Sequence, residues 1–224
     1  MDIELRHTPA FGVAHVDLAD GEEVQVEAGA MMATSADVDV EAKMEGGVLK
    51  SLRRGVLGGE SIFMTTYTGP GWVDVAARLP GDARVLDVTA DRPFVLDRGS
   101  FLAADGGVDI DSKWKGLKSL VGGEGGFMVH ATGQGKLIVS SYGAMDHITL
   151  DAGERIIVDT GHMIAFPDDM EWKMRRAASG RSLTSAKTGE FLVFEFVGPG
   201  EILTQSRNER SLLQRIETEI GGKE

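Results

Sequence analysis

Three stretches of the chain combine aromatic and β-branched residues, and each is closed by a Gly-x-Gly turn. A second short stretch of β-forming residues follows each turn. Strong β formers on both sides of a glycine-rich turn are typical of a β-hairpin. The sequence therefore predicts three hairpins, with strands over 62–67 and 72–76, 127–131 and 136–140, and 191–196 and 201–205.

The three hairpins recur at a nearly constant interval. A Gly-Glu pair precedes each first strand, and the closing turns begin at Gly69, Gly133 and Gly198, which are 64 and 65 residues apart. This regularity predicts three copies of one β unit of about 65 residues. The copies cover approximately 21–80, 91–145 and 153–207.

A second pattern precedes each hairpin in the same order. It consists of an acid, any residue, Gly, any residue, two large apolar residues and Ala, and it begins at Glu27, Asp97 and Asp159. An acid followed by Gly suits a tight turn, because an acidic side chain can accept a hydrogen bond from the backbone two residues on. We expect the apolar pair and Ala to begin a buried strand in every copy.

We expect residues 1–224 to form a single all-β domain with pseudo-threefold character, because one unit of this size buries little surface alone. A C-terminal helix is predicted over 208–220, where Leu212, Leu213, Ile216 and Ile220 share one face. Asn208 or Ser211 could cap it. The helix either packs on its own domain or lies against a neighbouring subunit.

Several of these motifs together resemble the AIM24 family, a former domain of unknown function. They are the acid-x-Gly turns, Gly59-Glu60-Ser61-Ile62-Phe63, the Gly-x-Gly closures, and Gly198-Pro199-Gly200 followed by Gln205-Ser206-Arg207-Asn208. The resemblance runs from about Ile3 to Asn208. It implies a β-sandwich or a double-stranded β-helix, similar to the tryptophan RNA-binding attenuation protein. It brings no catalytic residue set.

Composition narrows the classes of function. The formal net charge is −12, which disfavours broad binding to nucleic acid, and the 30 glycines fit a turn-rich β protein. With no cysteine, the chain has no disulfide, thiolate metal site or cysteine nucleophile. The N-terminus reads as a strand and not as a signal peptide, and there is no long apolar run. We therefore expect a soluble, cytoplasmic protein.

No catalytic or cofactor motif is apparent. The five histidines include no His-x-His pair, although His130 and His162 could approach each other. There is no Gly-x-Ser-x-Gly elbow, and the glycine-rich segments at 55–60 and 122–126 lack the Lys-Ser or Lys-Thr of a phosphate-binding loop. We expect no metal, no cofactor and no catalytic residue.

Basic residues gather in the segment between the two patterns of each copy, where the triplet Lys/Arg-Ser-Leu recurs. Segments that emerge together would focus positive potential on an acidic body. We predict an anionic-partner site, with an acidic lipid surface or an acidic protein as partner. The alternative is that the apolar residues there, such as Leu52, Trp114 and Trp172, plug the end of the fold or a subunit interface. The candidate residues are Lys50, Arg53, Arg54, Lys115, Lys118, Arg175, Arg176 and Arg181.

Three functions remain open. The first is a non-enzymatic, oligomeric β scaffold or binding module, which the triple repeat and the missing catalytic motif favour; we expect a homo-oligomer, with a trimer favoured. The second is an enzyme or metal-dependent binder with a site inside the sandwich, which rests on fold analogy alone. The third is RNA binding, which the net charge and the few aromatic residues oppose.

Overall fold

The fold of this protein, a computed structural model, is described for residues 1–44, 63–111, 128–177 and 192–221. It consists of antiparallel β-sheets with one C-terminal helix, as predicted, and the described strands form open sandwiches. After a leading strand, β1 (Asp2–Arg6), the chain builds the same six-stranded unit three times.

The bounds of the three units, called the first, second and third repeats, are as follows. The first repeat contains β2 (Val13–Leu18), β3 (Glu23–Glu27), β4 (Met31–Thr34), β5 (Asp39–Met44), β6 (Phe63–Thr68) and β7 (Gly71–Ala76). The second contains β8 (Ala83–Val88), β9 (Phe94–Asp97), β10 (Phe101–Asp105), β11 (Val108–Asp111), β12 (Met128–Gly133) and β13 (Gly135–Ser140). The third contains β14 (Met145–Leu150), β15 (Arg155–Asp159), β16 (Met163–Pro167), β17 (Glu171–Arg176), β18 (Leu192–Val197) and β19 (Gly200–Gln205).

Strand pairing is identical in the three repeats. The last strand lies between the first and the third, as in β2-β7-β4, and the fifth strand lies between the second and the fourth, as in β5-β6-β3. Each repeat therefore has two three-stranded halves. Each of these units begins one strand earlier than the ranges drawn from the sequence, because the first strand pairs with the last.

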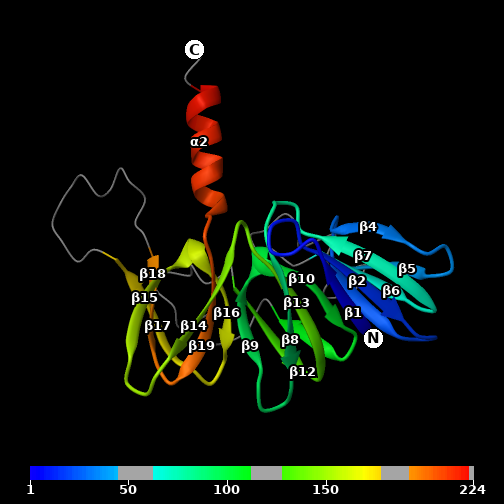
Figure 1. The fold of residues 1–224 in the computed structure, drawn as a ribbon, viewed down its shortest axis with the longest axis horizontal. Helices are drawn as coiled ribbons and strands as arrows, with labels where there is room; N and C mark the ends of the chain where they lie inside the picture. Colours follow the sequence, from blue (N-terminus) through cyan, green and yellow to red (C-terminus); the bar gives the residue numbers. More distant parts are fainter. Residues whose placement is uncertain (45–62, 112–127, 178–191, 222–224) are drawn as a thin grey trace.

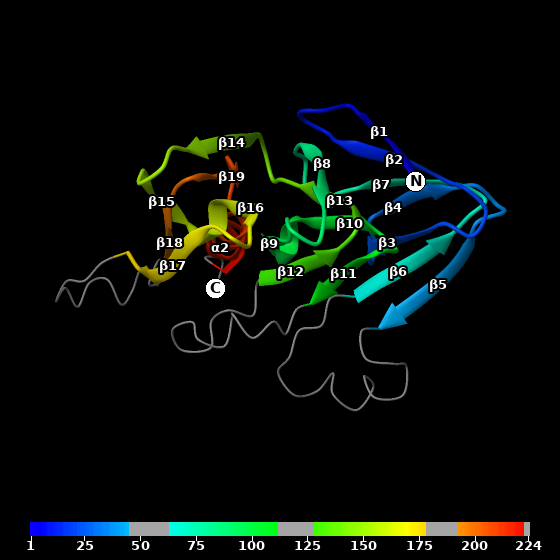
Figure 2. The same ribbon diagram turned by 90° about the horizontal axis from the view of Figure 1, so that it is seen from below.

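Neighbouring repeats share their sheets. β3 of the first repeat pairs with β10 of the second, and β9 of the second pairs with β16 of the third. These two junctions join half-sheets into two six-stranded sheets, β5-β6-β3-β10-β13-β8 and β11-β12-β9-β16-β19-β14. The ends of the molecule are the four-stranded sheet β1-β2-β7-β4 and the three-stranded sheet β15-β18-β17. Figure 2 shows the repeats following one another across the molecule.

Sharing of sheets makes the cores of the first and second repeats depend on a strand of the next repeat. Leu102 and Ala103, at the start of β10, belong to the apolar cluster that contains Val24, Val26 and Val75 of the first repeat. In the same way Ile164 and Ala165, at the start of β16, belong to the cluster of the second repeat. The third cluster holds an aromatic group in which Phe166 packs on Phe194 and Phe196.

The Gly-x-Gly turns require glycine for steric reasons. Gly133 has a φ of 99° and Gly135 a φ of 151°, in the region that favours glycine. A Cβ at Gly133 would lie 2.3 Å from the carbonyl oxygen of Gly107, and one at Gly135 would lie 2.7 Å from the Cβ of Asp105. Gly133 therefore packs closely against the backbone at Gly107, just before β11, and Gly135 packs against the side chain of Asp105 on β10.

The C-terminal helix, α2 (Glu209–Gly221), stands away from the sheets (Figure 1). Asn208 caps it, because its Oδ1 accepts hydrogen bonds from the backbone N–H groups of Arg210 at 2.9 Å and Ser211 at 3.4 Å. Leu213, Ile216 and Ile220 are exposed. The expectation that the helix packs on its own domain is therefore wrong for this apolar face.

Candidate binding surfaces

A cluster of basic side chains lies on the outer face of the three-stranded sheet β15-β18-β17. Its centre is Glu195 on β18, whose carboxylate is almost completely buried. Arg155 on β15 and Lys173 on β17 contact Oε1, the lysine at 3.2 Å, and the Nε of Arg175 donates to Oε2 at 2.9 Å. We call Arg155, Lys173 and Arg175, with Glu195, the basic face.

Strand register explains why these four side chains meet. Glu195 lies opposite Ile157 on one side and Lys173 on the other, and alternate residues of a strand point to the same face. Arg155 and Arg175 are then diagonal neighbours, within reach of a long side chain. Three cations share the carboxylate of Glu195. The same alternation places Asp159 and Glu171 on this face as well, so the positive charge is confined to the centre of the sheet.

Two of the eight residues predicted to bind an anionic partner lie in this region. Arg175 belongs to the basic face, and Arg176 follows it at the end of β17 with an exposed side chain. The other six lie outside the described residues; they are Lys50, Arg53, Arg54, Lys115, Lys118 and Arg181. The structure therefore does not test whether the three basic segments emerge together.

Sequence reasoning missed Arg155 and Glu195 as members of the site. Neither residue was predicted from the sequence to have a binding role, and the two are 40 positions apart in the chain. Only the antiparallel pairing of β15 with β18 brings them together. A signal was present in the alternation of β17, where Lys173 and Arg175 share one face and Trp172 and Met174 share the other.

Trp172 has a structural place in the third repeat. Its ring lies 5.4 Å from the ring of Phe166 and 5.6 Å from that of Phe194, both in edge-on geometry. It packs against the apolar cluster of this repeat. Trp172 therefore packs against the core of this repeat and is not an exposed side chain that could anchor the protein to a partner surface.

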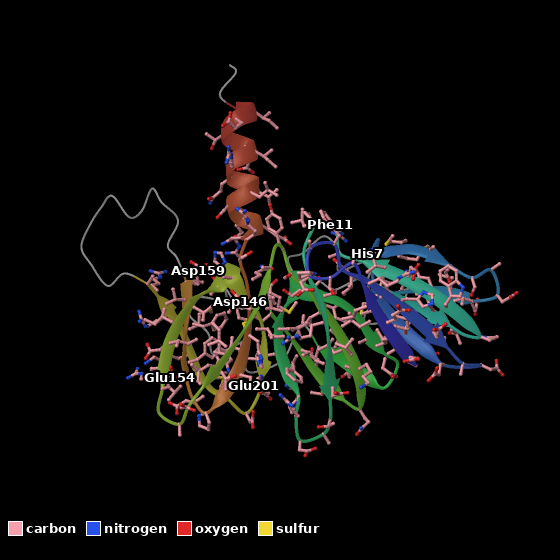
Figure 3. All side chains as sticks on the ribbon, in the orientation of Figure 1. His7, Phe11, Asp146, Glu154, Asp159 and Glu201 are labelled. Carbon is pink, nitrogen blue, oxygen red and sulfur yellow. The ribbon has the colours of Figure 1, made fainter. Side chains whose placement is uncertain are left out.

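The acidic residues of the repeated turns lie near the base of α2. Figure 3 labels Asp159 there, and the charge of Glu209, the first residue of α2, acts on both Glu27 and Asp97. Asp97 accepts a hydrogen bond from the N–H of Gly99 at 2.9 Å, and Asp159 accepts one from Gly161 at 2.8 Å, as the sequence predicts. Glu27 differs, because its longer side chain contacts the guanidinium of Arg78 at 3.3 Å.

Two of these acids have raised pKa values. Burial, reinforced by the negative charge of Glu209, raises the pKa of Asp97 to about 7 against the opposing hydrogen bond from Gly99. Burial also raises the pKa of Glu27, although Arg78 opposes the effect. Both effects arise near a cavity of about 270 Å³ that is lined by Glu27, Arg78, Gly99, Tyr142 and Glu209, among others. Its walls combine acids with one cation that Glu27 and the Ala28 carbonyl already engage.

Histidine does not create a metal centre in the described part of the chain. His130 and His162 do not meet: the Nε2 of His130 lies 3.0 Å from Asp168 Oδ2, and the Nδ1 of His162 lies 2.7 Å from the carbonyl oxygen of Gln205. No group of three or more His, Cys, Asp or Glu side chains in the described residues could hold a metal ion.

A second hollow, of about 280 Å³, lies between β8 and the strands β14, β16 and β19. Three of its charged residues, Arg92, His147 and Glu201, are engaged with one another, and Asp87 pairs with Lys136. Arg92 donates to Glu201 at 2.9 Å and lies over the ring of Phe94, and the Nε2 of His147 is 3.5 Å from the same glutamate. Figure 3 labels Glu201 on the lower side of the third repeat.

Comparison with known proteins assigns the family. A family profile described as mitochondrial biogenesis AIM24 matches residues 3–207. The chain belongs to the AIM24 family. An uncharacterized protein from Streptococcus pyogenes serotype M6 is 30% identical over 208 residues, which cover 88% of this chain and 82% of that protein. A crystal structure of a Streptococcus pyogenes protein superposes with a TM-score of 0.79 at 26% identity, covering 96% of this chain and 98% of that one.

The family and fold expectations are therefore confirmed, and neither relative's description gives an activity. Within the described residues of this AIM24-family protein, the structure contains no helix with the length and apolar character needed to cross a membrane.

Proposed function

We propose that this AIM24-family protein is a non-enzymatic, homo-oligomeric β scaffold that binds an anionic lipid surface through the basic face. The observation that carries the proposal is the placement of Arg155, Lys173 and Arg175 around the single carboxylate of Glu195. The side chains of Arg155 and Lys173 are 60% and 61% exposed, so their cationic groups remain available to a partner.

The electrostatics of the whole chain favour a localised contact. The body carries a formal net charge of −12, so a small positive region focuses the field that an anionic surface would meet. Each basic residue near an acidic lipid surface contributes roughly 1 kcal/mol. A few exposed cations therefore give weak binding per chain, and a homo-oligomer would multiply the contacts of one particle with one surface.

The proposal is tested by co-sedimentation with vesicles of phosphatidylcholine alone and of phosphatidylcholine with phosphatidylserine. We expect the protein to pellet only with the anionic vesicles, and less at high salt because exposed charges are screened. Lys173→Glu should reduce pelleting. Lys136→Glu is the matched control, since Lys136 is an exposed lysine on β13 that pairs with Asp87.

Two results would count against lipid as the partner. Equal pelleting with both vesicle types would show binding without charge recognition, and no pelleting with either would remove the lipid surface from the proposal. Salt-sensitive binding of the same protein to an acidic polypeptide, lost in Lys173→Glu, would then assign the basic face to an acidic protein.

A further inference from the structure

Two strands at opposite ends of the chain lack a neighbour that their counterparts have. Among the described strands, β4 pairs only with β7, and β15 pairs only with β18. The strands that correspond to β4, which are β10 and β16, each pair with a strand of the preceding repeat as well. The strands that correspond to β15, which are β3 and β9, each pair with a strand of the following repeat. β15 and β4 are therefore the two strands that a third junction of the same kind would join, and within one chain they do not pair with each other.

The exposure of side chains on β4 also reflects the missing neighbouring strand. Leu102 and Ile164, the second apolar residues of the repeated pattern, are fully buried in the core of the preceding repeat. Met32 holds the corresponding position in the first repeat and is 59% exposed. The sequence-based expectation of a buried strand is wrong for β4 in a single chain, because among the described strands β4 pairs only with β7.

At β15 an apolar side chain is exposed as well, as Met32 is at β4. Ile157 is 58% exposed, whereas Val95, its counterpart on β9, is completely buried beside Phe166 of the neighbouring strand. Exposed apolar side chains on an unprotected strand edge favour pairing with another chain, and soluble proteins normally cover or charge such edges. Met32 and Ile157 are thus exposed at the two edges, whereas Leu102, Ile164 and Val95 are buried at the internal junctions. Gln25, the counterpart of Ile157 on β3, is half-buried.

We propose that β15 of one copy pairs antiparallel with β4 of a second copy, so that the third repeat of one chain continues into the first repeat of the next. This inference rests on the oligomeric part of the proposed function and names its interface. The internal junctions set the register: Ala103 lies opposite Val26 and Ala104 opposite Gln25, as Ala165 lies opposite Leu96 and Phe166 opposite Val95. By the same register, Ala33 lies opposite Val158 and Thr34 opposite Ile157.

A backbone hydrogen bond that lies just beyond the paired strands occurs at both internal junctions and supports this register. At the first junction the N–H of Gly106 donates to the carbonyl of Glu23 at 2.9 Å, and at the second the N–H of Asp168 donates to Pro93 at 3.0 Å. The corresponding pair between copies is the N–H of Ala36 and the carbonyl of Arg155.

A second copy fits these edges because the internal pairs β3–β10 and β9–β16 already join the counterparts of β15 and β4. The joined sheet would have the order β17-β18-β15-β4-β7-β2-β1, which extends the pattern of the two internal six-stranded sheets. The contact joins unlike surfaces, so it generates a closed ring or an open filament. Lys173 and Arg175 lie on β17, at the edge remote from β15, and their cationic groups stay accessible to an anionic partner.

Size-exclusion chromatography with light scattering tests the proposal. Wild-type protein should elute at a multiple of the single-chain mass, and Met32→Lys and Ile157→Lys should each give a single-chain mass. Val40→Lys is the matched control, because Val40 is 50% exposed on β5, away from both edges, and it should keep the wild-type mass. A monomeric wild-type protein overturns the proposal. So does an oligomer that survives Met32→Lys but is lost in Ile216→Lys, which would assign the contact to α2.

Disulfide trapping tests the register. The chain has no cysteine, so Thr34→Cys combined with Ile157→Cys introduces the only two thiols. Opposed residues of antiparallel strands lie about 4.5–5.5 Å apart at Cα, which suits a disulfide. We expect covalent ladders on non-reducing gels. Val40→Cys with Ile157→Cys should give none, and an oligomer in which neither pair cross-links contradicts the β4–β15 pairing. Vesicle binding is scored separately, so loss of lipid binding by an intact oligomer refutes the lipid partner alone.

Discussion

The side chain of Asp97 accepts a hydrogen bond from the N–H of Gly99, while burial and the nearby Glu209 raise the pKa of the same carboxyl group to about 7. A carboxyl group whose pKa is higher in the folded than in the unfolded chain costs stability once it must ionise. The turn therefore holds an acid whose protonation matters near neutral pH.

Asp97→Asn should stabilise the protein above pH 7 and change little near pH 4. Below the ordinary pKa of 3.8 both states are protonated, and between 3.8 and about 7 only the unfolded state ionises, so wild-type stability falls as pH rises through that window. The expected gain is roughly 1 to 2 kcal/mol, after allowing for the solvent that reaches this turn. Urea unfolding across pH measures it, and Glu209→Gln should move the window to lower pH.

Glu195→Gln should destabilise the fold and strengthen binding to anionic vesicles. The substitution leaves Arg155, Lys173 and Arg175 without their shared carboxylate, and loss of charge-assisted bonds to a buried group costs about 1–3 kcal/mol. Glu201→Gln is the control, since that glutamate pairs with Arg92 outside the basic face. An unchanged melting temperature together with unchanged vesicle binding would contradict the account of the basic face.

Gly161→Ala should loosen the start of α2. A Cβ at Gly161 would lie 2.0 Å from the Nδ2 of Asn208, the residue that caps the helix. Displacing this cap should cost about 1 kcal/mol of helix stability, as Asn208→Ala would. Amide hydrogen exchange at residues 210–211 and far-ultraviolet circular dichroism report the effect. Gly99→Ala, at the corresponding turn, should leave α2 intact because its Cβ meets the side chain of Asp97 at 3.0 Å.

Phe166→Ala should lower the free energy of unfolding by about 3–5 kcal/mol. Phe166 is almost completely buried, and its ring lies 4.8 Å from that of Phe196 and 5.4 Å from that of Trp172. The fluorescence of Trp172 should shift to longer wavelength as its surroundings loosen. Phe11→Ala, at an exposed position, should change stability by less than about 0.5 kcal/mol, and a comparable loss there would contradict the assignment of this core.

Local features of the fold were predictable from sequence because they depend on neighbours along the chain. The hairpin strands, the Asx turns at Asp97 and Asp159, and the capping of α2 by Asn208 each follow from residue type and spacing. The pairing of strands from neighbouring repeats, β3 with β10 and β9 with β16, was not predictable in this way. β10 has the same alternation and length whether it pairs within its own repeat or also with β3, and no local signal separates the two.

The basic face illustrates the same limit. Arg175 was identified because it lies in a segment rich in basic residues, but the role of Arg155 depends on pairing between β15 and β18. The exposed face of α2 had a clear amphipathic pattern, and such a pattern is equally compatible with packing on the same chain or on another. Periodicity shows which face of an element is apolar without showing what covers it.

The sharing of sheets between repeats gives the chain a direction. The second and third repeats each place the start of their third strand into the core of the repeat before, and the first and second repeats receive that strand from the repeat after. Duplication or deletion of one whole unit in the gene would therefore preserve the same beginning and the same end. The number of repeats encoded in one polypeptide could change during evolution without redesign of either terminus of the array.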